Sequence, residues 1–292
     1  INGASGKEQD IVRSIQAWCS GDVSAVSGGR TRSGVRAPSQ IITYVSAHDN
    51  QTLWDKLAET MPQADEKERM RLNRMAAALY MTCQGSLFLL SGEEFARTKD
   101  GLEDSYNAPI AINRLDWEQA WKNRDLVDYY RGLLALRRQL PGLCDKSARA
   151  AERISHVQKE KGAVSFVIDN RPWVPVCQKG ETGDAPELEG KAHKNRWQTL
   201  KIVYNSSREE RPVTLDGEGW KVLCDWQDSW LWKTDRPAQG KMCIAPQSVL
   251  ILGQDGNTAE AETIETTEAT EAAGTAEHQH RGEETTWRKK AV

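Results

Sequence analysis

The sequence predicts an α/β fold in its first half, an all-β fold in its second half and a disordered C-terminal tail. Up to about residue 145, helical patterns alternate with short continuous apolar runs, which is typical of βαβ units with a parallel sheet. Residues 146–253 hold short apolar runs separated by turn residues, as in an antiparallel β-sandwich. Residues 254–292 are rich in Thr, Glu and Ala, and burial cannot offset their ordering entropy.

The first part begins with a helix expected over residues 5–20, because Ser5 and Glu8 have the spacing of a capping box. A Gly-, Ser- and Arg-rich loop follows, up to residue 37. The β-branched and aromatic run Ile41–Val45 predicts a buried strand, and a short helical pattern begins at Leu53.

A longer helix is expected over residues 65–84, followed by the apolar run Ser86–Leu90 as a second buried strand. An amphipathic pattern predicts a third helix over residues 123–140, which Pro141 and Gly142 end. Both apolar runs finish in polar residues, at the edge where α/β barrels place their active sites.

Seven strands are expected in the second part, with a polar insertion over residues 178–196. They are Ile154–Gln158, Val164–Ile168, Leu200–Asn205, Val213–Leu215, Lys221–Cys224, Met242–Ile244 and Val249–Leu252. The chain has eleven Trp and only three Phe, and Trp offers a flat face that suits stacking on sugar rings. Four Trp are stacking candidates, although core packing is the simpler interpretation for each one: Trp220, Trp226, Trp230 and Trp232. Trp230 and Trp232 alternate in the sequence and are expected on one face of a strand.

Composition excludes several classes of protein. The net charge of -3 gives no electrostatic reason to expect nucleic acid or an anionic membrane as a partner. No apolar run approaches the ~20 residues of a membrane helix, and no secretion signal precedes the first helix. We expect a cytoplasmic protein, or a secreted one if a signal lay upstream. The six Cys form no Cys-x-x-Cys pair, so we expect buried free thiols, no metal and no cofactor.

His48 and Asp49 follow the first apolar strand directly. An imidazole beside a carboxylate at a strand end can hydrogen-bond hydroxyl groups and stabilise developing positive charge. The alternative is that Asp49 or Asn50 caps the following helix.

The surrounding residues strengthen the first interpretation through a resemblance. Tyr44–Asn50 resembles the fourth signature region of the α-amylase family of glycoside hydrolases, which closes the seventh barrel strand in that family. Gly85–Phe95 resembles the eighth strand and its Gly-Glu-Glu turn. Ser105–Pro109 and Ile112–Trp117 look like the following loop of type I pullulanases, and Tyr129–Arg137 is similar to their eighth helix. Ile110 departs from the pattern, where many relatives have an acidic residue.

The resemblance implies the C-terminal part of a TIM (β/α)8 barrel followed by a β-sandwich. It implies a retaining hydrolase of α-1,6 bonds in glucans such as pullulan, amylopectin and limit dextrins. Asp49 then matches the carboxylate that holds sugar hydroxyls, and His48 the neighbouring transition-state stabiliser. Asn50, Tyr106 and Asn107 would contact substrate. The nucleophile and general acid belong to strands that precede this chain, so the chain alone is expected to be inactive and to need the missing N-terminal part of the barrel.

Length supports this interpretation, because a complete barrel takes ~250 residues and only about 140 precede the sandwich. A two-stranded piece leaves open edges, so we expect proteolysis to spare a sandwich core at 150–253 and to digest the first half. Glu93 and Glu94 are not expected to replace the missing acids, because neighbouring strand residues point to opposite faces. Asp100, Glu103 and Asp104 are expected to form a solvated acidic surface rather than a cation or sugar contact.

Two other functions remain open on the sequence. The chain could be a non-catalytic glucan-binding or structural module built on the Trp-rich sandwich. It could also be a small α/β enzyme with a His48–Asp49 dyad, although no Gly-x-Ser-x-Gly motif supports that class. Retardation by pullulan in a native gel without sugar release would favour the binding module.

Overall fold

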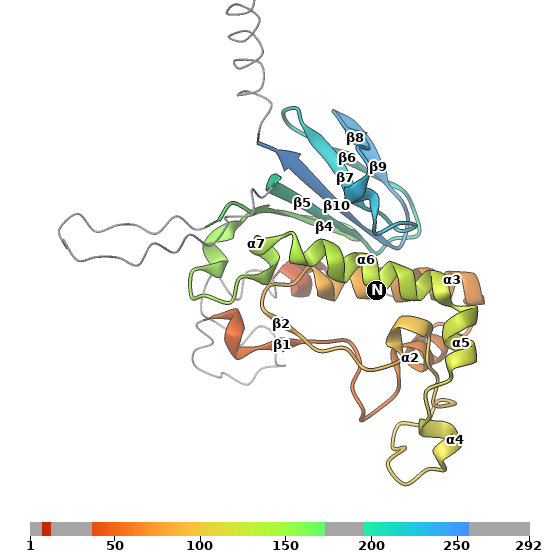
Figure 1. The fold of residues 1–292 in the computed structure, drawn as a ribbon. Helices are drawn as coiled ribbons and strands as arrows, with labels where there is room; N and C mark the ends of the chain where they lie inside the picture. Colours follow the sequence, from red (N-terminus) through yellow and green to blue (C-terminus); the bar gives the residue numbers. More distant parts are fainter. Residues whose placement is uncertain (1–7, 13–36, 173–195, 257–292) are drawn as a thin grey trace, which may run out of the picture.

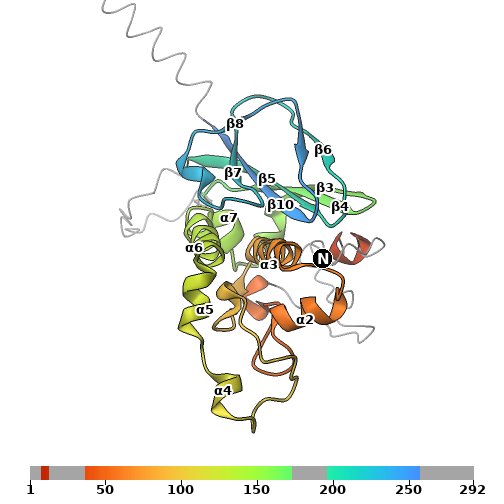
Figure 2. The ribbon, with the colours of Figure 1, turned by 90° about the vertical axis from the view of Figure 1, so that its right-hand side faces the viewer.

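The computed structural model describes residues 8–12, 37–172 and 196–256. Figure 1 shows a large β-sheet at the top, the helices α3 and α6 running beneath it, and a short pair of strands on the other side of those helices. Figure 2 looks along α3 and α6, so that the layer of helices under the sheet is seen end-on.

The first part of the chain contains most of the helices. Its elements are η1 (Pro38–Gln40), β1 (Ile42–Thr43), α2 (Leu53–Thr60), α3 (Glu66–Met81), β2 (Ser86–Leu87), η2 (Glu93–Phe95), α4 (Ile110–Asn113), α5 (Trp117–Lys122), α6 (Arg124–Arg138), α7 (Pro141–Cys144) and η3 (Ala150–Arg153). Residues 8–12 are helical, as expected for part of the first helix, and the rest of that prediction lies outside the described residues. The helices expected at Leu53, at 65–84 and at 123–140 form, whereas the sequence did not predict α4, α5 and α7.

The two apolar runs of this part form much shorter strands than expected. β1 and β2 have two residues each and pair in parallel, with Ile42 opposite Ser86 and Thr43 opposite Leu87. The expectation that both runs are buried is wrong for Ile42, Tyr44 and Phe88, which are 61%, 55% and 40% exposed. Among the described residues each strand has one hydrogen-bonded neighbour, so the outer edge of each strand is unpaired. The described residues therefore show two parallel strands and not a TIM barrel.

The second part is a two-layered antiparallel structure. Its strands are β3 (Ile154–Glu160), β4 (Ala163–Asp169), β5 (Trp197–Asn205), β6 (Arg211–Thr214), β7 (Trp220–Cys224), β8 (Pro237–Ala238), β9 (Lys241–Ile244) and β10 (Ser248–Asp255), with a 3-10 turn η4 (Leu231–Lys233). One sheet has the order β3-β4-β5-β10-β7-β8, and β6 and β9 form a second, smaller sheet. An apolar cluster that includes Val203, Val213 and Leu250 lies between them.

All seven strands expected in this part are present, and the sequence missed only β8, a two-residue strand that begins with Pro237. β10 continues to Asp255, beyond residue 253, where we expected the ordered part to end. Residues 173–195, which contain most of the polar insertion, and the tail from residue 257 lie outside the described residues.

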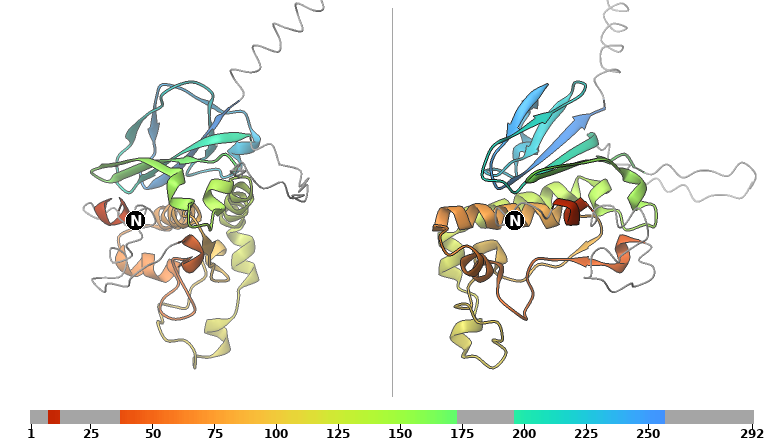
Figure 3. Two further views of the ribbon diagram at one scale, coloured as in Figure 1. Left: turned by 90° about the vertical axis from the view of Figure 1, so that its left-hand side faces the viewer. Right: turned by 180° about the vertical axis from the view of Figure 1, so that it is seen from behind.

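Helices from the first part and the large sheet share one hydrophobic core. That core includes Met75 and Tyr80 from α3, Leu136 from α6, and Ile168 and Ile251 from the sheet. The right-hand view of Figure 3, from behind the molecule, shows α3 and α6 lying along the sheet, and the left-hand view shows them end-on beneath it. The boundary that we expected near residue 145 is therefore not a boundary in the packing, because the helices before it cover the sheet that follows it.

The helix α3 is buried on two sides, which explains its weak amphipathic pattern. The sheet lies on one side of it, whereas Val45, Leu87 and Leu89, from the segments around β1 and β2, pack against the same core. A helix enclosed in this way has apolar residues around most of its circumference. Arg137 on α6 fixes the turn after α3, because its guanidinium donates to the carbonyl oxygens of Met81, Cys83, Gly85 and Leu143 at 2.5–2.9 Å.

The cysteines differ partly from expectation. Cys224 is buried and Cys83 half-buried, whereas Cys144 and Cys243 are exposed, and all four are free thiols. Burial raises the pKa of Cys83 to about 11 and that of Cys224 to about 12, so neither thiol is a ready nucleophile at neutral pH. Cys19 and Cys177 lie outside the described residues. Within the described ranges, no helix has the length and apolarity needed to cross a bilayer.

Candidate functional site

His48 and Asp49 lie on the loop that leaves the C-terminal end of β1. Their side chains are 84% and 76% exposed, and the imidazole Nε2 of His48 lies 3.4 Å from Oδ1 of Asp49. Neither side chain points into packed protein. Both side chains are therefore accessible to solvent near the C-terminal end of β1, where the sequence placed them.

The backbone turns sharply after this pair. Asn50 has a φ of +60°, in the left-handed region that Asn tolerates better than most residues. Thr52 then caps α2, because its Oγ1 accepts a hydrogen bond from the N–H of Asp55 at 3.2 Å. The alternative prediction, that Asp49 or Asn50 caps this helix, is therefore wrong, because the cap is Thr52.

Lys99 holds the loop in place, a role that the sequence did not suggest. Its Nζ donates to the carbonyl oxygens of His48 at 3.1 Å, Asn50 at 2.6 Å and Glu103 at 3.3 Å. The residue is only 3% exposed, and its backbone N–H donates to Oδ2 of the buried Asp55 at 2.7 Å. One buried ammonium group therefore ties the His48–Asn50 turn to the loop that follows η2.

Glu93 anchors the other end of the same loop. Its carboxylate accepts hydrogen bonds from the hydroxyls of Ser46 at 2.5 Å, Tyr80 at 3.0 Å and Tyr130 at 3.2 Å. Burial raises the pKa of Glu93, and the three hydroxyl donors oppose that shift. Ser46 precedes His48 by two residues, so this buried carboxylate connects the end of β1 to α3 and α6.

Glu93 and Glu94 do not form a pair of catalytic acids. The sequence argument treated both as strand residues, but they lie on the 3-10 turn η2. Glu93 is buried, and Oε2 of Glu94 accepts the N–H of Gly92 at 2.9 Å. The geometry supports the structural role that the sequence favoured for both.

The loop with Tyr106 and Asn107 is exposed. Tyr106 is 89% and Ile110 84% exposed, and no hydrogen bond in the described chain joins Tyr106 or Asn107 to His48, Asp49 or Asn50. Ser105 and Asn113 close the loop through hydrogen bonds of 2.9 Å and 2.6 Å. Asp100, Glu103 and Asp104 are exposed, in agreement with a solvated acidic surface. In the described chain, Tyr106 and Asn107 are thus not hydrogen-bonded to the His48–Asn50 turn.

The tryptophans of the β part are largely occupied by protein contacts. Trp220 is 5% exposed, and the Arg71 guanidinium covers the ring of Trp226 at 4.2 Å. Trp230 and Trp232 do not alternate on a strand, because this segment forms the turn η4. Their rings stack on each other with centroids 6.0 Å apart, and the Lys233 ammonium lies 4.0 Å from the centre of the Trp230 ring.

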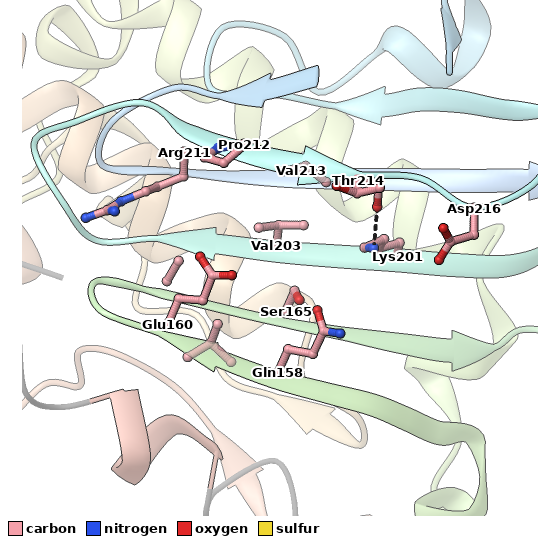
Figure 4. A pocket seen from close by; sticks show the side chains of 12 residues that line it. Gln158, Glu160, Ser165, Lys201, Val203, Arg211, Pro212, Val213, Thr214 and Asp216 are labelled. Carbon is pink, nitrogen blue, oxygen red and sulfur yellow. Dashed lines mark hydrogen bonds between the residues drawn. The ribbon is translucent and has the colours of Figure 1, made fainter. Parts of the chain in front are cut away.

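A groove of about 210 Å³ opens on the β part, between β3, β4 and β5 on one side and β6 on the other (Figure 4). Lys201 lies inside it and donates to the carbonyl oxygen of Thr214 at 2.7 Å. None of the predicted site residues lines this groove. Among the described residues, no cluster of three or more His, Cys, Asp or Glu is arranged to hold a metal ion.

Comparison with known proteins gives one consistent result. The family model "Pullulanase, all-beta domain" matches residues 186–228. The pullulanase of Bacillus subtilis (strain 168) is 41% identical over 119 residues, which are 41% of this chain and 17% of that protein. Pullulanase 1, chloroplastic, of Arabidopsis thaliana is 39% identical over 87 residues, 30% of this chain and 9% of the plant protein.

Solved structures extend the similarity over most of the described chain. The pullulanase of Paenibacillus barengoltzii in complex with maltohexaose and alpha-cyclodextrin has a TM-score of 0.64 and 28% identity, over 87% of this chain and 35% of its own. The pullulanase of Bacillus acidopullulyticus has a TM-score of 0.64 and 25% identity, over 82% and 26% of the two chains. The resemblance to pullulanases, which are debranching glycoside hydrolases, is confirmed. This chain spans only a fraction of their length, at most 35% in these four comparisons.

Proposed function

We propose, from the match to the C-terminal portion of pullulanases, that this chain supplies the sugar-holding His48 and Asp49 of an α-glucan debranching hydrolase. The observation that carries the proposal is the placement of both side chains at the free end of β1, exposed and held by buried anchors. The pullulanase of Paenibacillus barengoltzii forms a complex with maltotetraose, which supports an α-glucan as the substrate class of this site.

The chemistry assigns different tasks to this chain and to the rest of the enzyme. Retaining glycoside hydrolysis needs a nucleophilic carboxylate and a general acid ~5–5.5 Å apart. Glu93 is buried among hydroxyl donors and Glu94 binds a backbone N–H, so neither serves as one of the pair. We assign both reacting groups to barrel strands outside this chain. Asp49 would accept hydrogen bonds from glucose hydroxyls, and His48 would donate to the same ring.

The exposed outer side of the β1–β2 pair supports a barrel partner. Ile42 and Tyr44 are more than half exposed, and isolated short strands with uncovered apolar faces are seldom stable. Further parallel strands would pair with the open edge and bury these side chains. They would also bring the two reacting carboxyls to the edge of the sheet where His48 and Asp49 lie.

The second candidate, a Trp-based glucan-binding module, has less support. A sugar ring needs an open aromatic face. The described contacts occupy Trp220 and Trp226, and Trp230 and Trp232 stack on each other.

Titration of the full 292-residue chain with maltotetraose, followed through the His and Trp ring signals in NMR, tests the proposal. We expect the signals of His48 to shift, the indole signals of Trp230 and Trp232 to stay in place, and pullulan to release no reducing sugar. The Asp49→Asn variant should lose the His48 response, and Asp104→Asn, on the exposed acidic loop, should keep it. Shifts confined to the indoles would support the binding module, and release of reducing sugar would show that the reacting groups lie within this chain.

A further inference from the structure

A second site lies away from the strand ends. An open groove of about 1130 Å³ separates the N-terminal part of α3 from loops of the β part that carry Arg208, Trp226 and Gln247. It shares no lining residue with the predicted sugar site.

Two arginines on α3 form the polar wall of this groove. Arg71 and Arg74 are three residues apart and so share a face of the helix. The guanidinium carbon of Arg71 lies 4.2 Å from the centre of the Trp226 ring, and that of Arg74 lies 5.4 Å from the centre of the Tyr129 ring. The Tyr129 hydroxyl donates to the backbone oxygen of Asp225 at 2.8 Å, so the two rings belong to one connected wall. Both guanidinium groups are therefore held in place by flat aromatic surfaces.

Neither guanidinium has an acceptor for its buried N–H. The Nε atoms of Arg71 and Arg74 are inaccessible to solvent and have no hydrogen-bond partner among the described residues. An aromatic ring contacts the face of a guanidinium and leaves the N–H groups at its edge available. Burial lowers the pKa of Arg71, although an arginine remains charged in any protein environment. The terminal NH2 groups of both arginines are also hydrogen-bonded to none of the described residues and, unlike the Nε atoms, are not shut off from solvent, so they can donate to a ligand in the groove.

The neighbouring carboxylates already have other partners. Glu68 accepts from Arg208 at 3.4 Å and from Gln247 at 3.3 Å, and Glu66 lies 3.8 Å from Lys122. Asp65 accepts the N–H of Glu68 as the cap of α3. Beside the aromatic wall, Asp225 pairs with Arg236 at 2.8 Å, and Asp128 accepts the indole N–H of Trp230 at 3.0 Å. Glu68 also interacts electrostatically with Arg71, three residues further along α3, but no carboxylate among the described residues is hydrogen-bonded to Arg71 or Arg74.

We propose that Arg71 and Arg74 form a binding site for a phosphate-type oxyanion, either free or as the ester of a sugar. A guanidinium fork donates parallel N–H groups to phosphate oxygens, and two such groups match a doubly charged anion better than a single carboxylate. The groove is larger than a phosphate ion, which leaves room for an attached sugar. This site does not depend on the function of His48 and Asp49.

Isothermal titration of the full chain with inorganic phosphate and with glucose 6-phosphate, against chloride at matched ionic strength, tests the proposal. We expect saturable binding that weakens about tenfold or more in Arg71→Gln/Arg74→Gln, because each lost charge-assisted bond reduces affinity strongly. Arg138→Gln, which removes an exposed cation at the C-terminal end of α6, outside the groove, is the matched control and should bind as the wild type does. Circular dichroism checks that each variant is folded.

The two ligands distinguish the sources of the anion. Equal affinities indicate a site for the free oxyanion, and tighter binding of glucose 6-phosphate indicates a sugar phosphate. The proposal is overturned if the wild type shows no saturable binding of either ligand, an outcome that requires no variant. It is also overturned if the folded double variant binds as tightly as the wild type.

Discussion

The hydroxyl of Thr82 lies 2.7 Å from the hydroxyl of Tyr204 in the interior of the molecule. Thr82 directly follows α3 as its C-cap, and Tyr204 lies on β5 of the large sheet, 122 residues further along the chain. This contact joins the end of α3 to the large sheet, as the shared hydrophobic core also does. The helices α3 and α6 and the sheet are one packed unit.

Leu136→Ala on α6 should therefore destabilise both parts of the chain together. Leu136 is 1% exposed in the shared core, and truncating such a leucine costs about 3 kcal/mol. Chemical denaturation should show one transition that shifts equally by far-UV circular dichroism and by Trp fluorescence. Leu134→Ala on the same helix, at a 38% exposed side chain, is the control and should cost less than about 1 kcal/mol. Separate transitions for helices and sheet would contradict a shared core.

The same packing changes what limited proteolysis should release. The sequence suggested that the whole first half would be digested. Because α3 and α6 cover the sheet, we expect a protected core that includes residues 66–81 and 124–138 as well as the strands. The exposed loop around Tyr106 should be cut first. Mass spectrometry of the resistant fragments distinguishes the two outcomes, since a core that starts near residue 150 would restore the original expectation.

Gly132→Ala should destabilise the protein, although alanine normally favours a helix. A Cβ atom at Gly132 would lie 2.8 Å from the Cβ of Ser229 and still closer to its hydroxyl, so α6 must move away from the β part. Overpacking of this kind typically costs about 1–3 kcal/mol. The free energy of unfolding should show a smaller penalty in a Ser229→Gly background, where that side chain is absent. An unchanged penalty would place the strain elsewhere.

Lys99→Met should loosen the loop that carries His48. The substitution removes three hydrogen bonds from a buried ammonium and leaves backbone oxygens without a donor, at a cost on the order of 3 kcal/mol. Proteolysis and hydrogen exchange over residues 46–52 should both accelerate. Lys56→Met is the control, because Lys56 is exposed and its ion pair with Glu59 is a surface pair of little energetic value. Equal protection of the loop in both variants would contradict the role of Lys99.

Glu93→Gln should change how stability depends on pH. Burial raises the pKa of Glu93 in the folded protein above the ordinary value of 4.5, so the folded state binds the proton more tightly than the unfolded state. Its contribution is thus fully present below pH 4.5 and is lost as the pH rises through the folded pKa. Glutamine cannot titrate, so the stability of the wild type relative to Glu93→Gln should fall over that window. A difference that stays constant from pH 4 to pH 8 would contradict the raised pKa.

The β part was predictable because its signals are local. Short apolar runs bounded by turn residues located seven strands, and only β8, with two residues, was missed. The prediction for Ile42 and Tyr44 failed for a non-local reason, because a strand is buried only if other strands cover it. Trp230 and Trp232 alternate in sequence as strand residues do, but the segment closes into a 3-10 turn in which the two rings stack.

In the candidate site, too, the sequence located the features that depend on local signals and missed those that depend on distant parts of the chain. The sequence located His48 and Asp49 after a strand, and both side chains are exposed there. It did not indicate Lys99, because two of its three acceptors are 49 and 51 residues away along the chain. The arginine pair on α3 also gave no signal, since Trp226 and Tyr129 reach it only through the tertiary fold.

The most direct test of the proposed role of His48 and Asp49 is the activity of a chimera. This chain would replace the C-terminal portion of the Bacillus subtilis pullulanase. The two proteins are 41% identical over 119 matched residues. The rate of reducing-sugar release from pullulan would then be measured with and without Asp49→Asn. We predict an active chimera that loses at least about two orders of magnitude in rate with Asp49→Asn, because the sugar at the cleavage site is no longer held for attack. A folded chimera whose rate is unaffected by the substitution would contradict the assignment of this chain to the sugar-holding part of the site.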